Sequence, residues 1–191
     1  FSANTPYIGF FDSKINTNSN NQIMIVASVD DPAIATTVDR EIVRIDVDAS
    51  GNLLSESAPY KEGDVLPGQI ETVADFGTGP HESAINDTGD LLYLADLNGD
   101  TAKDIALYLN GMLLAQEGGT SPVGGRNYEL LSGRGNDLGN GGDYVFKANL
   151  DGSTADDDVL IKNGALFKQE GQLLADIAPF TLTTFGTASG P

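Results

Sequence analysis

Regularly spaced acidic and amide side chains in one short segment could bind a metal ion. Residues 96–104 read DLNGDTAKD, which places side-chain oxygens at Asp96, Asn98, Asp100 and Asp104. Calcium takes about six to eight oxygen ligands, and a tight loop with acidic residues at alternate positions can bring several of them together. One hypothesis is therefore a calcium site; the alternative is an ordinary turn with solvated carboxylates.

A second, weaker version of this pattern follows in residues 149–157, which read NLDGSTADD. Here a serine stands where the first segment has a carboxylate, so the site would have one charged ligand fewer. The acids of the N-terminal third are too widely spaced for the same loop. The candidate ligands of the second segment are Asn149, Asp151, Ser153 and Asp157.

The sequence contains no clear set of catalytic residues. His81 is the only histidine, and a Ser-His-Asp triad or a histidine metal site would have to use it. It lies in a predicted loop, and the chain has no G-x-S-x-G motif. Paired carboxylates for glycoside hydrolysis are conceivable among 28 acidic residues, but no pair stands out. We therefore predict a protein that is not an enzyme, with a polysaccharide-active enzyme as the weakest alternative.

The net charge disfavours some classes of binding partner. The chain has 28 acidic and 10 basic residues, a formal net charge of -18, and no cysteine. Nucleic acid is disfavoured because phosphate binding needs clustered Lys and Arg. No apolar run is long enough to cross a bilayer, so membrane insertion is not expected. We predict a secreted or cell-surface protein, and a start at Phe1 in place of methionine suggests a processed or excised chain.

The elements that would position these loops are internal repeats. Residues 89–118 align with residues 142–171 without a gap, and about half of the positions are identical. A looser copy lies upstream. Short apolar runs, the alternating segment 70–76 that begins at Ile70, and the Asn110-Gly111 dipeptide, a strong hairpin signal, predict four β-strands per copy. The predicted fold is all-β, with three β-propeller-like blades: residues 1–69, 70–126 and 127–178.

The C-terminal residues resemble the beginning of a further repeat. Phe185-Gly186-Thr187 repeats Phe76-Gly77-Thr78, and Thr181 stands in the place of Thr72. Residues 179–191 are thus predicted to be an extra strand that either pairs within the chain or is donated to another copy. Three blades are too few for a closed propeller, which has about four to eight.

Two families share parts of this pattern. Residues 85–93, followed by an Asn-Gly hairpin and Glu117-Gly118, resemble the bacterial tandem-repeat family with an NxxGxxxAF motif, although Tyr93 and Gly139 depart from it. That resemblance implies an exported surface protein and no defined activity. Residues 96–105 also resemble the calcium loop of FG-GAP propeller repeats.

The leading hypothesis is an extracellular structural protein that assembles with itself, for example into a filament that shares strands and binds calcium. The alternative is a propeller-like surface adhesin or ligand-binding module. In both cases, Glu62-Gly63, Glu117-Gly118 and Glu170-Gly171 are expected to be architectural: each Glu caps a turn or bonds a neighbouring unit, and each Gly has a positive φ.

Overall fold

The described part of the chain consists of β-strands, turns and loops. The computed structural model describes residues 5–8, 15–36, 38–77, 82–131, 135–173, 181–183 and 185, and among these there is no helix. The described part of the chain therefore has no helix that could span a bilayer. The prediction of an all-β protein is confirmed.

Within the described ranges, fourteen strands form three antiparallel sheets, none of which closes into a barrel. Sheet 1 contains β1 (Asn16–Thr17), β2 (Gln22–Val29), β3 (Asp39–Val47) and β4 (Leu53–Lys61). Sheet 2 contains β5 (Val73–Phe76), β6 (Ser83–Ile85), β7 (Leu91–Leu97), β8 (Ile105–Leu109) and β9 (Met112–Gln116). Sheet 3 contains β10 (Tyr128–Leu130), β11 (Asn136–Leu138), β12 (Tyr144–Leu150), β13 (Asp158–Lys162) and β14 (Ala165–Gln169).

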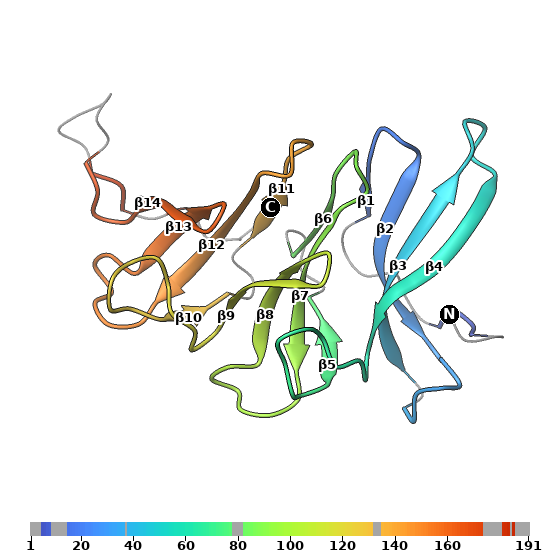
Figure 1. Ribbon diagram of the computed structural model, residues 1–191, viewed down its shortest axis with the longest axis horizontal. Coiled ribbons are helices and arrows are strands. Elements are labelled where there is room, and N and C mark those ends of the chain that lie inside the picture. Colours follow the sequence, from blue (N-terminus) through green and yellow to red (C-terminus); the bar gives the residue numbers. More distant parts are fainter. Residues whose placement is uncertain are drawn as a thin grey trace.

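The sheets follow one another in sequence order, with sheet 2 between the other two (Figure 1). Strands β2, β7 and β12 occupy equivalent positions in their sheets. Each pairs antiparallel with the next strand along the chain, which is β3, β8 or β13, respectively. Sheet 2 therefore has one face toward sheet 1 and one toward sheet 3. Sheets 1 and 3 lie at opposite ends of the row.

The tight turns follow from residues that tolerate a left-handed backbone. Asn110 and Asn163 have a φ of 50°, and the glycines after them have a φ of 79° and 77°. This is the type of hairpin that Asn-Gly favours, and its twist matches the right-handed twist of the strands. The predicted positive φ is also confirmed for Gly63, Gly118 and Gly171.

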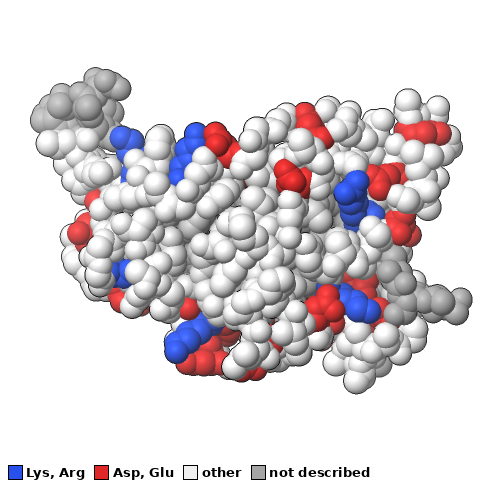
Figure 2. Space-filling model, viewed as in Figure 1, with Lys and Arg blue, Asp and Glu red and all other residues white. Residues whose placement is uncertain are grey.

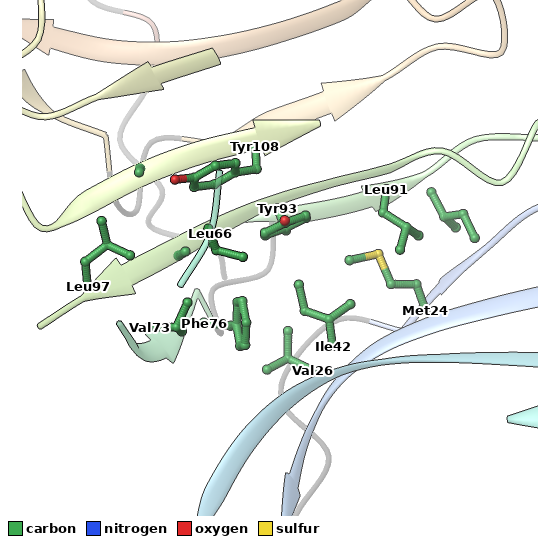
Figure 3. Packing of buried hydrophobic residues seen from close by; sticks show 13 residues of the cluster. Met24, Val26, Ile42, Leu66, Val73, Phe76, Leu91, Tyr93, Leu97 and Tyr108 are labelled. Carbon is green, nitrogen blue, oxygen red and sulfur yellow. The ribbon is translucent and has the colours of Figure 1, made fainter. Parts of the chain in front are cut away.

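The core between sheets 1 and 2 is built from alternate residues of facing strands. Met24, Val26 and Ile42 project from sheet 1 toward Tyr93 and Leu91 of sheet 2 (Figure 3). The Tyr93 ring stacks on Tyr108, with ring centroids 5.6 Å apart. Burying a large apolar side chain stabilises a fold by about 1.5–3 kcal/mol, so this interface contributes strongly to holding the two sheets together.

The opposite face of sheet 2 packs on sheet 3. Leu92, Leu94 and Leu107 contact a cluster that includes Phe146 and Ile161, all nearly inaccessible to solvent. Both faces of sheet 2 are therefore buried, which explains why β7 reads as an almost continuous apolar run.

Two details of the predicted repeats are wrong. Sheets 2 and 3 have five strands instead of four, because the first strand is interrupted: β5 and β6 both pair with β7, and β10 and β11 both pair with β12. The alternating segment that begins at Ile70 enters the sheet only at Val73. Ile70 itself is 90% exposed, because residues 67–70 form turns and a bend that precede the sheet.

Candidate functional site

The predicted calcium loop of the second repeat is a solvent-facing turn after β7. Asn98 donates its side-chain N–H to Oγ1 of Thr72 at 2.8 Å, and an Asp100 carboxylate oxygen accepts the main-chain N–H of Ala102 at 3.1 Å. Burial, followed by the nearby charge of Asp104, raises the pKa of Asp96. Among the described residues, no group of three or more His, Cys, Asp or Glu side chains is arranged to hold a metal ion. Calcium binding stays a prediction.

A hollow of about 260 Å³ adjoins this loop. Asp75, Glu82 and Asp96 contribute to its lining, together with apolar residues of β7 and β8. Three carboxylates therefore line a concavity beside the loop, whereas Asn98 and Asp100 are engaged in the turn itself.

The corresponding loop of the third repeat surrounds an arginine. The Arg126 guanidinium donates to the main-chain oxygens of Asp151 at 2.5 Å and Ser153 at 3.2 Å, and to the Asp156 carboxylate at 2.9 Å. The Asp151 carboxylate accepts the main-chain N–H of Asn127 at 2.9 Å. A protein cation thus lies against the main chain of this loop, and the predicted ligand Asp151 bonds a main-chain N–H with its carboxylate.

The structure also describes two further predicted ligands of this loop. Asp157 uses its main-chain oxygen to accept the N–H of Leu150 at 2.9 Å. The buried side-chain oxygen of Asn149 has no hydrogen-bond partner among the described residues. His81, the only histidine, lies outside the described residues.

A ladder of side-chain amides links the three repeats. Asn18 Nδ2 donates to the main-chain oxygen of Asn86 at 2.6 Å, and Asn86 Nδ2 donates to the main-chain oxygen of Gly139 at 3.2 Å. Each asparagine also accepts main-chain N–H groups in its own turn, as Asn86 does from Asp90 at 2.8 Å. The asparagine of the NxxG pattern thus closes a turn and bonds the following repeat. Gly139 has no side-chain amide, so the ladder ends at this residue.

The first strand of each of the second and third repeats is bound on two sides. On one side, Gly63 donates to the Val73 oxygen at 2.9 Å, and Gly118 donates to the Tyr128 oxygen at 2.8 Å. On the other side, Val73 pairs with Leu97 and Tyr128 pairs with its counterpart in β12. The Glu-Gly turn of one repeat therefore holds the first strand of the next sheet.

Glu117 reinforces the junction between the second and third repeats. One of its carboxylate oxygens accepts the main-chain N–H of Leu131 at 2.9 Å, so this glutamate bonds the neighbouring repeat as predicted. Glu62 instead accepts the main-chain N–H of Arg40 at 3.1 Å, within its own sheet. Burial raises the pKa of both carboxyls.

Residues 181–183 begin in the same way as the first strand of a repeat. Gly171 donates to the Leu182 oxygen at 2.8 Å, and Leu182 donates to the Gln172 oxygen at 2.9 Å. This pair of bonds is equivalent to those that hold Val73 and Tyr128. The described residues contain no fourth sheet for this strand to join, so Leu182 has the turn contacts without the ladder. Most of the predicted extra strand, 179–191, lies outside the described residues.

The outer face of sheet 3 is partly apolar and partly ionic. Lys147 lies at the position that Val26 and Leu94 occupy in the other sheets, and it pairs with Asp158 at 3.3 Å. Beside this ion pair is a hollow of about 410 Å³, to whose lining Leu160 and the exposed Phe167 contribute. This face therefore differs from the buried apolar faces that meet between the sheets.

The other end of the row also carries an ionisable side chain at a core position. Glu41 lies opposite Ala27, where Ala106 and Val159 lie opposite the equivalent alanines of sheets 2 and 3. Its side chain is fully buried, and burial, followed by the adjacent Asp31 side chain, raises its pKa to about 7. Lys61 Nζ contacts Asp31 at 3.1 Å.

Sequence reasoning missed the residues that distinguish the repeats from one another. Arg126, Glu41 and Lys147 were not singled out, although Lys147 aligns with the apolar Leu94 in the ungapped self-comparison. The sequence does signal such a residue, because it places a charge at a repeat position where the other copy is apolar. On the face shown in Figure 2, charged side chains gather toward the rims and the middle is largely uncharged.

Comparison with known protein families, with curated proteins and with solved structures found no match to this chain.

Proposed function

We propose that this chain is an extracellular structural repeat protein that assembles with itself through its C-terminal end. The observation that carries the proposal is the placement of Leu182. Its main-chain bonds to Gly171 and Gln172 repeat those of Val73 and Tyr128, each of which leads directly into another sheet. A strand begun in this way can add to a sheet of a second chain through main-chain hydrogen bonds.

The outer face of sheet 3 supports the same proposal. Phe167 is 55% exposed beside the 410 Å³ hollow, and half-buried Val145 and Leu160 contribute to the lining. The Lys147–Asp158 pair adds an ionic component to this face, and both side chains are nearly inaccessible to solvent. Contacts between separable partners are commonly more polar than obligate ones. The extracellular setting is proposed from the net charge of -18, because strong acidity is common in proteins that meet calcium outside the cell.

Light scattering over a range of protein concentrations tests the proposal. The molar mass of the wild type is expected to rise above the 20.0 kDa of one chain. Phe167→Asp should reduce association because it places a charge on the contact face. Met112→Asp is the matched control, since Met112 is 58% exposed on β9 of sheet 2. A wild type that stays at the mass of one chain at every concentration would contradict the proposal.

A second candidate function is ligand binding in the same hollow. The lining combines the aromatic rings of Tyr144 and Phe167 with Asp143, Asp137 and Lys162. Aromatic faces beside polar side chains are able to bind small polar ligands such as sugars. A glycan-binding screen would support this candidate if hits disappeared in Phe167→Asp but not in Met112→Asp.

A further inference from the structure

Residues 5–8 and residues 181–183 are two incomplete versions of the same structural element. In the second repeat the first strand has both sets of contacts: Val73 accepts from Gly63 at 2.9 Å, and Thr72 accepts from Asn98 of its own sheet at 2.8 Å. At the N-terminal end, Pro6 accepts from Asp30 at 3.1 Å, which is the sheet-side contact. At the C-terminal end, Leu182 has the turn-side contact. Among the described residues, the N-terminal segment thus shows the sheet-side contact and the C-terminal segment shows the turn-side contact.

The registers show that the two segments belong at equivalent positions. Tyr7 forms a bridge to Val29 at the end of β2, as Val73 pairs with Leu97 at the end of β7. Leu182, in turn, follows its glycine turn in the way that Val73 does. Tyr7 and Leu182 are therefore both counterparts of Val73, the first on the sheet side and the second on the turn side.

We propose that residues 181–183 and 185 of one copy displace residues 5–8 of another copy from the edge of β2, so that Leu182 lies opposite Val29. This inference rests on the proposed self-assembly and specifies the surface that receives the donated strand. The main-chain N–H of Asp30, which now donates to Pro6, then donates to the oxygen of Thr181.

The segment to be displaced pairs with β2 over a short length. Residues 5–8 form a bridge to β2 at Tyr7, and the main-chain N–H of Ile8 donates to the Ser28 oxygen at 2.9 Å, whereas β5 makes three pairs with β7. Pro6 has no N–H with which to extend the ladder, while Thr181 has one. The Tyr7 hydroxyl also donates to a carboxylate oxygen of Glu56 across the outer face of sheet 1. Replacing Pro6 by Thr181 therefore adds one main-chain donor to the ladder.

The receiving sheet must belong to another copy. Leu182 is bound at the sheet 3 end, and β2 lies at the opposite end with sheet 2 in between (Figure 1). A contact from the tail of one chain to the head of the next leaves a free tail and a free head, so it adds further chains into a ring or a filament.

Cysteine pairing tests this assignment, because the chain has no cysteine of its own. Chains carrying Val29→Cys are mixed with chains carrying Leu182→Cys, oxidised, and separated on a non-reducing gel. We expect disulfide-linked dimers from this mixture, and none from Val29→Cys mixed with Met112→Cys on sheet 2. Equal yields in the two mixtures would overturn the assignment.

A locked chain gives an independent test that does not need two variants to associate. Tyr7→Cys combined with Val29→Cys in one chain should close the edge of β2 when oxidised. We expect the oxidised form to lose association and the reduced form to regain it. An oxidised, intramolecularly linked chain that associates like the wild type would overturn the assignment while leaving self-assembly in place. A wild type that never associates would instead contradict the proposed function itself.

Discussion

The side-chain amide of Asn18 donates a hydrogen bond to the main-chain oxygen of Asn86, 2.6 Å away, and Asn86 is its counterpart in the next repeat. Asn86 repeats the contact to Gly139 at 3.2 Å. The same side chain that closes a turn thus aligns neighbouring sheets. This coupling explains why a turn residue recurs in the repeats even though it contributes nothing to the apolar core.

Replacing Asn86 by alanine should lower the stability of the whole row of sheets. The change removes the amide that bonds Gly139 and the oxygen that accepts the Asp90 N–H. Loss of partners for partly buried groups costs about 1–3 kcal/mol. Chemical denaturation measures this cost, and Asn52→Ala in the exposed hairpin of sheet 1 is the control, expected to cost less. Equal costs would argue against the ladder.

Arg126→Met should loosen the loop of the third repeat. The substitution keeps most of the apolar stem but leaves the main-chain oxygens of Asp151 and Ser153 without the guanidinium. Hydrogen exchange of residues 151–157 should accelerate, with an expected destabilisation of about 1–3 kcal/mol. Exchange that is unchanged in this loop would show that Arg126 does not order it.

Glu41 should make stability fall as the pH rises toward neutrality. Its pKa is raised from 4.5 to about 7 in the folded chain, so the folded state binds its proton more tightly than the unfolded state. The contribution is complete below pH 4.5 and is lost as the pH rises through about 7, with an upper bound of about 3 kcal/mol. Glu41→Gln, which resembles the protonated form, should flatten this part of the profile. An identical pH dependence in wild type and variant would rule out Glu41 as its source.

Calcium should bind the second repeat more tightly than the third if the predicted site exists. Arg126 already supplies a cation to the third loop, whereas the second is surrounded by Asp96, Asp104 and the exposed Glu71. A calcium titration followed by thermal unfolding should show stabilisation that Asp104→Asn removes. Glu129→Gln, an exposed acid on β10, is the charge-matched control. Stabilisation that is equal in both variants would indicate a nonspecific charge effect.

Much of the architecture could be predicted because it depends on local rules. The Asn110-Gly111 hairpin and the glycines after Glu62 and Glu117 follow from backbone preferences, and the structure confirms them. The all-β fold follows from short apolar runs between such turns. The start of β5 could not be read in the same way. Ile70 continues the alternating pattern, but the preceding turn keeps it out of the sheet.

Some residues distinguish one repeat from another, and their roles depend on neighbouring strands and sheets. A lysine at position 147 and a glutamate at position 41 look like ordinary surface charges in a strand, and only the sheet register places them where other repeats have apolar residues. The role of Arg126 similarly requires the loop after β12 to fold back over β10. Long-range placement of this kind leaves little signal in one sequence.

Sedimentation velocity of the wild type over a wide range of concentrations tests the central claim most directly. Association through the C-terminal strand predicts a sedimentation coefficient that increases with concentration, and Leu182→Asp should abolish the increase. A single species of one chain for both proteins at every concentration would contradict the account.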